Sequence, residues 1–160
     1  MPKKSESHRQ PGIRPARTDD IPAVLRIARL GLASERYFSH YFDELHNPLS
    51  RFFIAEDPPG GDAVAFLIFW RIEDTIEIHD IVVAPEYRGR GIGRALMKLP
   101  FEEAKRANAT RIFLEVRESN RRARRFYEFL GFTMTARRSG YYRNPSEDAL
   151  ILVWESRPPK

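Results

Sequence analysis

The sequence predicts an α/β (α+β) fold, in which helices lie on both faces of a single mixed, mostly antiparallel, twisted sheet of about seven strands. Two observations lead to this prediction. Apolar residues recur at helical spacing between residues 21 and 32, so a helix comes early in the chain. Three strand-like runs joined by turn residues come next, and strand and helix patterns then alternate up to a final hairpin.

The first third of the chain is expected to hold one strand and two helices. Residues 12–17 have the pattern of a strand. The Thr-Asp-Asp segment at 18–20 offers N-cap oxygens and negative charge to the helix that follows, and Pro22 is tolerated near its start. Residues 37–45 are rich in aromatic side chains and are expected to form a second, short helix.

The middle of the chain is predicted to be an antiparallel meander of strands over residues 51–55, 63–72 and 75–83. Pro58 and two glycines separate the first two strands, and a Glu-Asp turn precedes the third. A long helix is then expected from Gly91 to about Asn108. It contains Pro100, which cannot donate a backbone hydrogen bond and therefore predicts a kink.

The last part of the chain predicts two more strand and helix units. A strand is expected over residues 111–117, and the next helix is capped by Ser119 or Asn120 and ended by Gly131. Strands over 132–137 and 148–154 complete the sheet.

The 160 residues, 42% of them apolar, suffice for one domain with a hydrophobic core. We expect residues 1–11 to form a flexible basic tail, 12–155 to form one folded domain and 156–160 to form a short tail. No run approaches the ~18 apolar residues of a membrane helix, and the N-terminal segment lacks the apolar stretch of a signal peptide. A cytoplasmic protein with no membrane partner is expected.

The chain contains no cysteine, which excludes disulfides, cysteine metal sites and any acyl-cysteine intermediate. The histidines lack ligand partners at suitable spacing, so no metal site is predicted. The net charge of +5 suits a polyanionic partner or a phosphate-rich cofactor, and a basic solubilising tail explains part of it equally well.

A glycine-rich turn at residues 88–94 (Arg-Gly-Arg-Gly-Ile-Gly-Arg) follows a β-branched strand and opens the long helix. Glycines allow positive φ and close approach to a ligand, and a helix N-terminus offers unpaired N–H groups, so such a turn binds phosphate oxygens. It lacks the Gly-Lys-Ser/Thr of nucleotide-hydrolase loops and is shorter than a dinucleotide fingerprint. The alternative is a plain strand-to-helix connection, but the flanking arginines favour an anion site.

The segment 88–93 resembles the Arg/Gln-x-x-Gly-x-Gly/Ala loop of the GNAT superfamily of N-acetyltransferases, which holds the pyrophosphate of acetyl-CoA. Two later segments, Leu-Glu-Val-Arg at 114–117 and Phe-Tyr-Glu-Phe-Leu-Gly-Phe at 126–132, fit the same pattern in order. Gly-Tyr-Tyr at 140–142 and Glu-Asp-Ala at 147–149 are similar to the RimI-type enzymes, which acetylate the N-terminus of a ribosomal protein. The resemblance covers roughly residues 12–154 and implies the GNAT fold, with acetyl-CoA as co-substrate.

The resemblance also implies a set of cofactor-binding residues. Backbone groups of the strand before the turn would contact the pantetheine arm and polarise the thioester carbonyl, and Asn120 would add a contact beyond its role as a helix cap. The implied set is Ile81, Val82, Val83, Arg88, Gly89, Arg90, Gly91, Ile92, Gly93, Arg94, Asn120 and Tyr127.

Amide formation requires a neutral amine. An α-amine, with a pKa of ~7.7–8.0, is neutral in roughly a tenth of molecules at pH 7, against about one in 2,500 for a lysine amine, so one carboxylate acting through water is an adequate base. Glu115 is the candidate, because it lies mid-strand among apolar residues. Alternation places Phe113, Glu115 and Arg117 on one face, so a surface-facing or arginine-paired carboxylate is the alternative. The resemblance implies that this glutamate is the general base.

Tyr127 is the residue that the resemblance implies as the general acid for the departing CoA thiolate, whereas its helical spacing fits a core tyrosine equally well. Tyr141 and Tyr142, in a turn-rich stretch, are candidates for gripping the acceptor, together with Tyr37. The alternative is that this tyrosine pair packs against the aromatic segment around Tyr37 and Tyr41. The four arginines at 121, 122, 124 and 125 depart from the family, and they form either a solvated face or a contact for phosphate.

The predicted function is acetyl transfer from acetyl-CoA directly to a protein N-terminal α-amine, with a ribosomal protein as one implied acceptor. Two other functions stay open: an acetyltransferase for a small-molecule amine such as a polyamine or antibiotic, and a non-catalytic CoA- or RNA-binding module. No stable nucleic-acid partner is expected, and the chain is expected to be a monomer or a weak homodimer.

Overall fold

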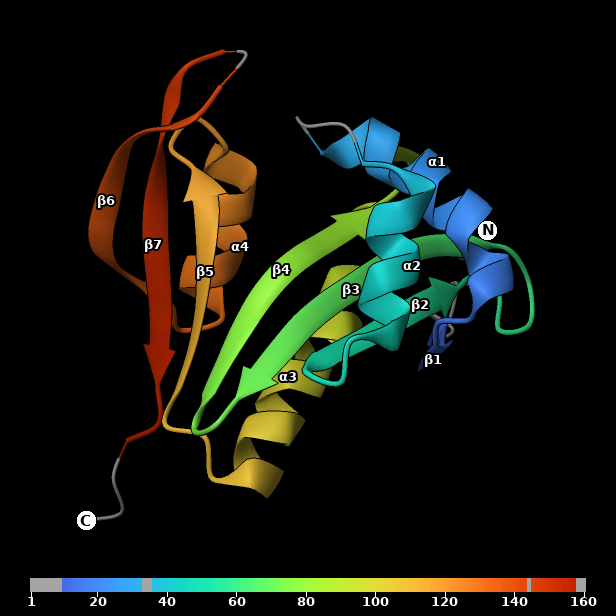
Figure 1. The fold of residues 1–160 in the computed structure, drawn as a ribbon, viewed down its shortest axis with the longest axis horizontal. Coiled ribbons are helices and arrows are strands. Elements are labelled where there is room, and N and C mark those ends of the chain that lie inside the picture. The colour runs from blue at the N-terminus through green and yellow to red at the C-terminus, as the bar shows by residue number, and fades with distance from the viewer. Residues whose placement is uncertain (1–9, 33–35, 144, 158–160) are drawn as a thin grey trace, which may run out of the picture. The chain divides into compact units, whose positions relative to one another are not determined.

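The computed structural model of the protein describes residues 10–32, 36–143 and 145–157. Its strands form a seven-stranded sheet in the order β1-β2-β3-β4-β5-β7-β6 (Figure 1). The pair β4–β5 is parallel, whereas β1–β2, β5–β7 and β6–β7 are antiparallel. The predicted fold class, a mixed sheet with packed helices, is confirmed.

The chain divides into two compact units. The first unit holds the chain up to Ile68 together with Asp80–Leu99, and the second holds Phe69–His79 together with the chain from Pro100 onward. The strands β3 and β4 and the helix α3 therefore each contribute residues to both units.

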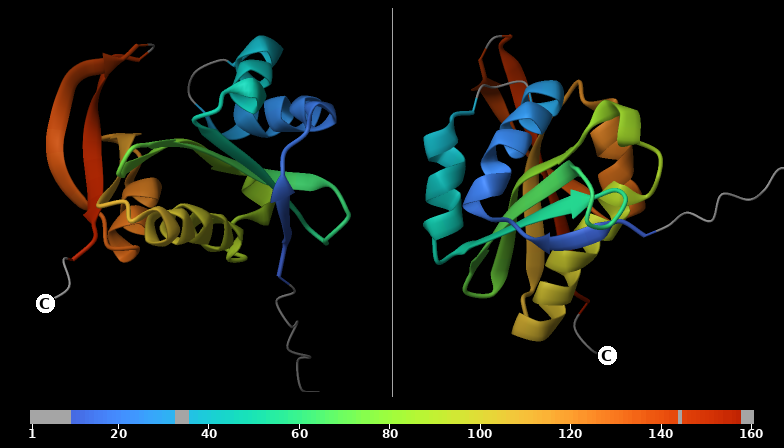
Figure 2. Two further views of the ribbon diagram at one scale, coloured as in Figure 1. Left: turned by 60° about the horizontal axis from the view of Figure 1, so that its bottom comes forward. Right: turned by 90° about the vertical axis from the view of Figure 1, so that its right-hand side faces the viewer.

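The first unit begins with one strand, a 3-10 turn and two helices. On its strands, α1 and α2 cover one face, and the first part of α3 lies on the other (Figures 1 and 2). The elements that lie wholly or partly in this unit are β1 (Gly12–Pro15), the 3-10 turn η1 (Thr18–Asp20), α1 (Ile21–Gly31), α2 (Phe38–His46), β2 (Ser50–Glu56), β3 (Ala63–Ile72), β4 (Thr75–Val83), the 3-10 turn η2 (Pro85–Tyr87) and α3 (Ile92–Ala107).

The core of the first unit is built from the apolar stripe of each helix and the inward residues of the strands. Val24 of α1, Ile54 of β2 and Leu96 of α3 have no exposed surface. Tyr41 of α2 is equally buried, and its ring meets that of Phe66 edge-on with centroids 5.6 Å apart. Tyr41 is therefore a core residue of the first unit.

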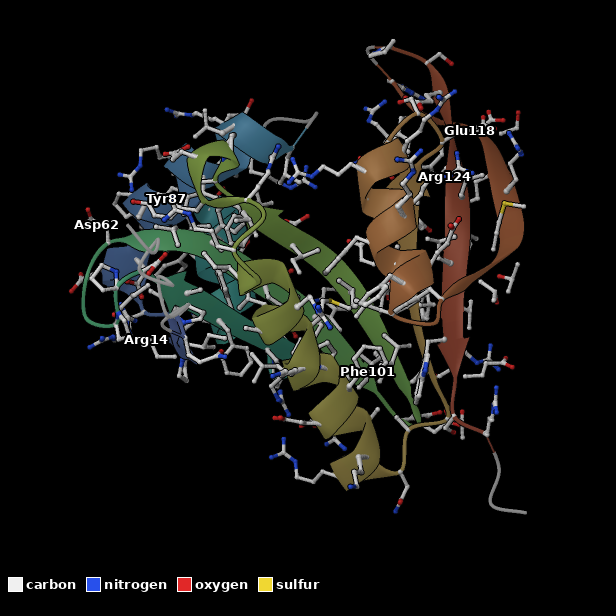
Figure 3. All side chains as sticks on the ribbon, turned by 180° about the vertical axis from the view of Figure 1, so that it is seen from behind. Arg14, Asp62, Tyr87, Phe101, Glu118 and Arg124 are labelled. Carbon is white, nitrogen blue, oxygen red and sulfur yellow. The ribbon has the colours of Figure 1, made fainter. Side chains whose placement is uncertain are left out.

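The second unit contains the remaining parts of β3, β4 and α3, and then β5 (Arg111–Arg117), α4 (Arg121–Phe129), β6 (Thr133–Tyr142) and β7 (Glu147–Glu155). Figures 1 and 3, taken from opposite sides, show α4 covering one face of β5 and β7. Ring contacts build the core on that face: Trp154 to Phe101 at 5.1 Å, Phe101 to Phe132 at 6.0 Å and Phe132 to Tyr127 at 5.7 Å between centroids.

Every predicted helix and strand is present, and most ends differ by only a residue or two. The larger difference is at β6, which was expected to stop at residue 137 but continues to Tyr142. Tyr141 and Tyr142 therefore lie in a strand, and the prediction of a turn-rich stretch there was wrong. Pairing within the β6–β7 hairpin extends the strand, since Tyr142 lies opposite Glu147 of β7.

The predicted capping of α1 by side-chain oxygens was also wrong. Asp20 occupies the N-cap position but makes no capping hydrogen bond. Its carboxylate accepts instead from the backbone N–H of Arg17 at 2.7 Å and from two nitrogens of Arg14, each at 2.8 Å. The Nε of Arg14 also donates to Glu56 at 2.6 Å, so one guanidinium joins β1, the start of α1 and the end of β2.

These contacts predict a pH-dependent contribution of Arg14 to stability. Hydrogen bonds from Arg14 hold the pKa of Asp20 and the pKa of Glu56 below their ordinary values. Groups with a lowered folded-state pKa stabilise the fold above their unfolded pKa, and this contribution is lost as the pH falls through the folded pKa. Replacing Arg14 by Met should therefore cost about 1–3 kcal/mol at pH 7 and progressively less below pH 4.

Urea unfolding across this pH range measures the effect. Arg29→Met is the matched control, because Arg29 is exposed on α1 and should change stability by less than about 0.5 kcal/mol. An equal loss at pH 7 and pH 3 for the Arg14 variant would show that lost packing, and not the ion pairs, is responsible.

Candidate functional site

The glycine-rich turn between β4 and α3, in the first unit, has the backbone of an anion-binding loop. Gly89 and Gly91 have φ of +78° and +82°, values that side chains other than glycine rarely adopt. A Cβ placed on either glycine would meet no atom within 4 Å, so the surface beside the turn is open. The third glycine of the motif, Gly93, lies inside α3.

The start of α3 adds hydrogen-bond donors to this turn. The backbone N–H of Ala95 bonds to the carbonyl of Gly91 at 3.0 Å, and this is the first bond of the helix. The N–H groups of Ile92, Gly93 and Arg94 precede it and have no helical carbonyl to bond. They lie at the positive end of a 16-residue helix, which is where a phosphate is favoured.

The arginines of the turn differ in their surroundings. The Nε of Arg88 donates to the carbonyl of Val83 at 3.1 Å, so this side chain ties the turn to the end of β4. The guanidinium of Arg90 lies 4.9 Å from the ring centre of Tyr87, and it lies 3.7 Å from a carboxylate oxygen of Asp57 in the β2–β3 connection. Arg90 and Arg94 are exposed. A diphosphate therefore fits the turn.

The end of α1 approaches this region closely. A Cβ on Gly31 would lie 2.4 Å from a methyl carbon of Val82 and 3.6 Å from a guanidinium nitrogen of Arg88. The absence of a side chain at residue 31 thus lets α1 reach the strand that leads into the turn. Ile81 and Val83 alternate with the buried Val82 along this part of β4.

The second unit holds the predicted base. The carboxylate of Glu115 on β5 is 20% exposed and lies 3.3 Å from a guanidinium nitrogen of Arg138 on β6. The hydroxyl of Tyr141 interacts with the same carboxylate, and this interaction, with burial, raises the pKa of Tyr141. Glu115 is therefore paired with an arginine, and the structure brings Glu115 and Tyr141 together.

A break in strand pairing explains how β6 places two side chains on one carboxylate. Arg138 lies opposite Ala149 of β7, and the register then shifts before Tyr142. Gly140 lies in the shifted stretch with φ of +61°, and its N–H bonds to a carboxylate oxygen of Asp148 at 2.9 Å. This irregularity places Tyr141 beside the same glutamate as Arg138.

Tyr142 has a different set of neighbours from Tyr141. The guanidinium of Arg117 lies 4.1 Å from the ring centre of Tyr142, and burial raises the pKa of this tyrosine to about 12. Arg117 also pairs with Glu147 at 3.3 Å, and Glu147 accepts from the backbone N–H of Ser119. Tyr142 thus belongs to contacts that hold the β6–β7 hairpin against β5.

Two further polar side chains lie on β4 within the second unit. The Nε2 of His79 is 3.7 Å from a carboxylate oxygen of Glu77, and the His79 ring lies 4.2 Å from the ring centre of Trp70. Glu77 and Phe113 of β5 are partners in the parallel register, so Glu77 shares a sheet face with Glu115. Its negative charge also acts on Tyr141.

The helix α4 carries two predicted cofactor residues. Asn120 caps it, since its side-chain oxygen accepts from the N–H of Ala123 at 3.2 Å, as predicted. Tyr127 is 7% exposed, and its ring packs against Phe126 and Phe132, as expected for a core tyrosine. The face of β5 that packs on these rings carries Leu114 and Val116, so Glu115 lies on the opposite face.

The remaining predicted residues are exposed. Tyr37 precedes α2 and is 68% exposed. Three of the four arginines of α4 are exposed, and the fourth, Arg124, donates to the carbonyl of Glu118 at 2.9 Å (Figure 3).

Two side chains that contact the site were missed from the sequence. Arg138 and Asp57 lie far along the chain from Glu115 and Arg90, and nothing local marks them as partners. One signal was available for Arg138: in a strand, Arg137 and Arg138 must point to opposite faces, so one of them faces the sheet side that carries Glu115.

Among the described residues, no three His, Asp or Glu side chains gather in a way that could hold a metal ion. None of the helices in the described part of the chain is both long and apolar enough to cross a membrane.

Comparison with known proteins places these features in a family. The model of the acetyltransferase (GNAT) family matches residues 20–132. A protein of Bacillus subtilis (strain 168), named putative [ribosomal protein bS18]-alanine N-acetyltransferase, is 33% identical over 88% of this chain and 92% of its own length. An N-alpha-acetyltransferase of Sulfurisphaera tokodaii is 30% identical over 94% of this chain and 95% of its own.

A solved structure has the same fold. The ribosomal-protein-S18-alanine N-acetyltransferase of Escherichia coli superposes with a TM-score of 0.81 at 28% identity, covering 91% of this chain and 94% of that one. With the family match over most of the chain, the chain belongs to the acetyltransferase (GNAT) family and is an acetyl-CoA-dependent N-acetyltransferase.

Proposed function

We propose that this enzyme acetylates the N-terminal α-amine of a protein in the cytoplasm, with a ribosomal protein as the first candidate acceptor. The observation that carries the proposal is the surroundings of Glu115, a partly exposed carboxylate that lies beside the guanidinium of Arg138 and interacts with the hydroxyl of Tyr141. A single carboxylate suits an α-amine, because a lysine amine needs about 3.4 kcal/mol more to lose its proton. The relatives named putative [ribosomal protein bS18]-alanine N-acetyltransferase and N-alpha-acetyltransferase support the same acceptor class.

In the first unit, the proposed task is cofactor binding. The N–H groups at the start of α3 and the positive-φ backbone of Gly89 and Gly91 would hold the diphosphate of acetyl-CoA, with Arg90 and Arg94 adding positive charge. Backbone groups of residues 81–83 would orient the pantetheine arm. Acetyl-CoA supplies the activated acetyl thioester.

In the second unit, the proposed tasks are proton transfers. Glu115 would take a proton from the acceptor amine through a water molecule, and the hydroxyl of Tyr127 would supply one to the departing sulfur. A phenol is a weaker acid than an ordinary thiol by ~1.5 pKa units, so the second transfer needs ~2 kcal/mol from its surroundings. Asn120 would contact the pantetheine arm, and Tyr141 and Tyr142 would contact the acceptor. Tyr37, which belongs to the first unit, is a further candidate for contacting the acceptor.

A thiol-release assay tests the acceptor class. Short peptides that differ in their first two residues are compared with polyamines and aminoglycosides at equal concentration. Selective turnover of one class of peptide is expected. Turnover of small amines alone would replace this proposal with the small-molecule alternative, and no turnover of any amine would favour a binding module.

Replacing Glu115 by Gln should lower kcat about 100-fold near pH 7, because the general base is lost. The loss should shrink as the pH rises, since the free amine becomes neutral without help. The pH dependence of kcat measures this. Glu118→Gln is the control, because Glu118 pairs with Arg137 and not with the candidate site. If Glu115→Gln kept the wild-type activity at every pH, Glu115 would not be the general base.

Replacing Gly91 by Ala should weaken CoA binding at least tenfold, since the side chain strains a backbone at φ of +82° from which the anion-binding N–H groups are presented. Calorimetry with CoA measures the affinity. Gly60→Ala is the matched control, because Gly60 has φ of +79° and open space around it but lies in the β2–β3 connection. Equal losses in the two variants would point to general destabilisation.

A further inference from the structure

Arg138 is a charged side chain next to the candidate base for which the proposed chemistry has no role. Its guanidinium lies 3.3 Å from Glu115 and 5.5 Å from the ring centre of Tyr141, and its side chain is 55% exposed. Glu115 therefore has a cation on one side and a hydroxyl donor on the other, both supplied by β6.

The other charged groups around Glu115 in the second unit have partners of their own. Glu77 of β4 pairs with His79, and Arg117 of β5 pairs with Glu147 of β7. The Tyr142 hydroxyl is a neutral group near Glu115. Among the described residues of this unit, Arg138 is thus the cation paired with Glu115.

The charge of Arg138 has a chemical consequence for an amine. A lone carboxylate attracts a proton to any amine beside it and so favours the ammonium form, which cannot attack a thioester. A cation at the same place repels a second positive charge and favours the neutral amine. A base that is paired with a cation can accept a proton through water without trapping its substrate as an ammonium ion.

We propose that Arg138, which pairs with Glu115 and lies beside Tyr141, favours the neutral form of the acceptor amine through its positive charge. This inference rests on the proposed function, because it assigns a role to Arg138 in the same reaction. Arg138 donates no proton and forms no bond to the acetyl group. It acts through its charge.

The pH profile of kcat gives the first test, because kcat reports the ionisation of groups in the complex with the acceptor, where Arg138 can act on the amine. In the Arg138→Gln variant, the fall of activity on the acid side of the pH profile should occur about 0.5–1 pH unit higher, since the amine is no longer kept neutral by a nearby cation. Activity should therefore fall about three- to tenfold at pH 7 and be nearly unchanged at pH 9. Arg138→Lys keeps the charge and should keep most of the wild-type profile.

Arg137→Gln is the matched control. Arg137 is the neighbouring residue on the same strand, and it pairs with Glu118 and Asp148 instead of Glu115. This variant should leave the fall of activity on the acid side at the same pH. A loss of the same size at every pH in the Arg138→Gln variant would show a merely structural role and overturn the proposal.

The second test needs no acceptor. The interaction with Glu115 raises the pKa of Tyr141, and the positive charge of Arg138 lowers it. The protein has six tyrosines, and the phenol of Tyr141 can be followed by carbon NMR of ring-labelled tyrosine, with Tyr141→Phe to assign its signal. The titration should move to lower pH in Glu115→Gln and to higher pH in Arg138→Gln. An unmoved or lowered titration in Arg138→Gln would overturn the proposal.

The two tests separate this inference from the proposed function. If the wild-type protein acetylates peptides but the Tyr141 titration is the same in the wild type and in Arg138→Gln, the role inferred for Arg138 is wrong and the proposed function stands. If the titration responds as expected but no peptide is acetylated, the charge of Arg138 acts beside Glu115 as inferred, and the proposed function and the effect on an amine are both wrong.

Discussion

Burial of one face of β5 and β7 is the constraint on which the candidate base depends. Leu114 and Leu152 lie opposite each other in the register, and both are almost fully buried. Because side chains alternate along a strand, a slip of one residue would turn Glu115 toward the aromatic core beneath α4. Placing an unpaired carboxylate there costs several kcal/mol, so packing on one face keeps the polar groups on the other.

The turn of the first unit follows from a comparable constraint. The chain leaves β4 after the buried Val82 and must begin α3 so that Ile92, which is 2% exposed, packs into the core. Two residues with positive φ make this change of direction, and glycine adopts positive φ without steric cost. The hydrogen bond from Arg88 to Val83 then ties the turn to its strand. A loop shaped by these requirements presents backbone donors outward, which is the property that an anion needs.

Charge is arranged differently in the two units. The turn gathers positive charge and backbone N–H groups, as suits a diphosphate. Around Glu115, carboxylates and guanidinium cations are interleaved: Glu115 with Arg138, and Glu147 with Arg117. Each of these pairs offsets its own charge. This balance fits chemistry on an amine, which must arrive in water as a cation but react as a neutral molecule.

Local chemistry determined much of this protein from the sequence alone. Apolar patterns, aromatic content and turn residues predicted the helices and strands, the spacing of glycines and arginines predicted a candidate anion-binding turn, and Asn120 was predicted as a helix cap from its side chain. Strand alternation also predicted the face on which Glu115 lies. These features depend on residues a few positions apart, so the sequence contains their cause.

Only the tertiary structure decided which distant groups meet. Asp20 lost its predicted capping role because Arg14 binds it, and that guanidinium also reaches Glu56, 42 residues away. The contacts of Glu115 with Arg138 and Tyr141 depend on the register of β6 against β7 and on its break near Gly140. Register is set by the summed packing of whole strands, so no short segment of sequence determines which side chains it will bring together.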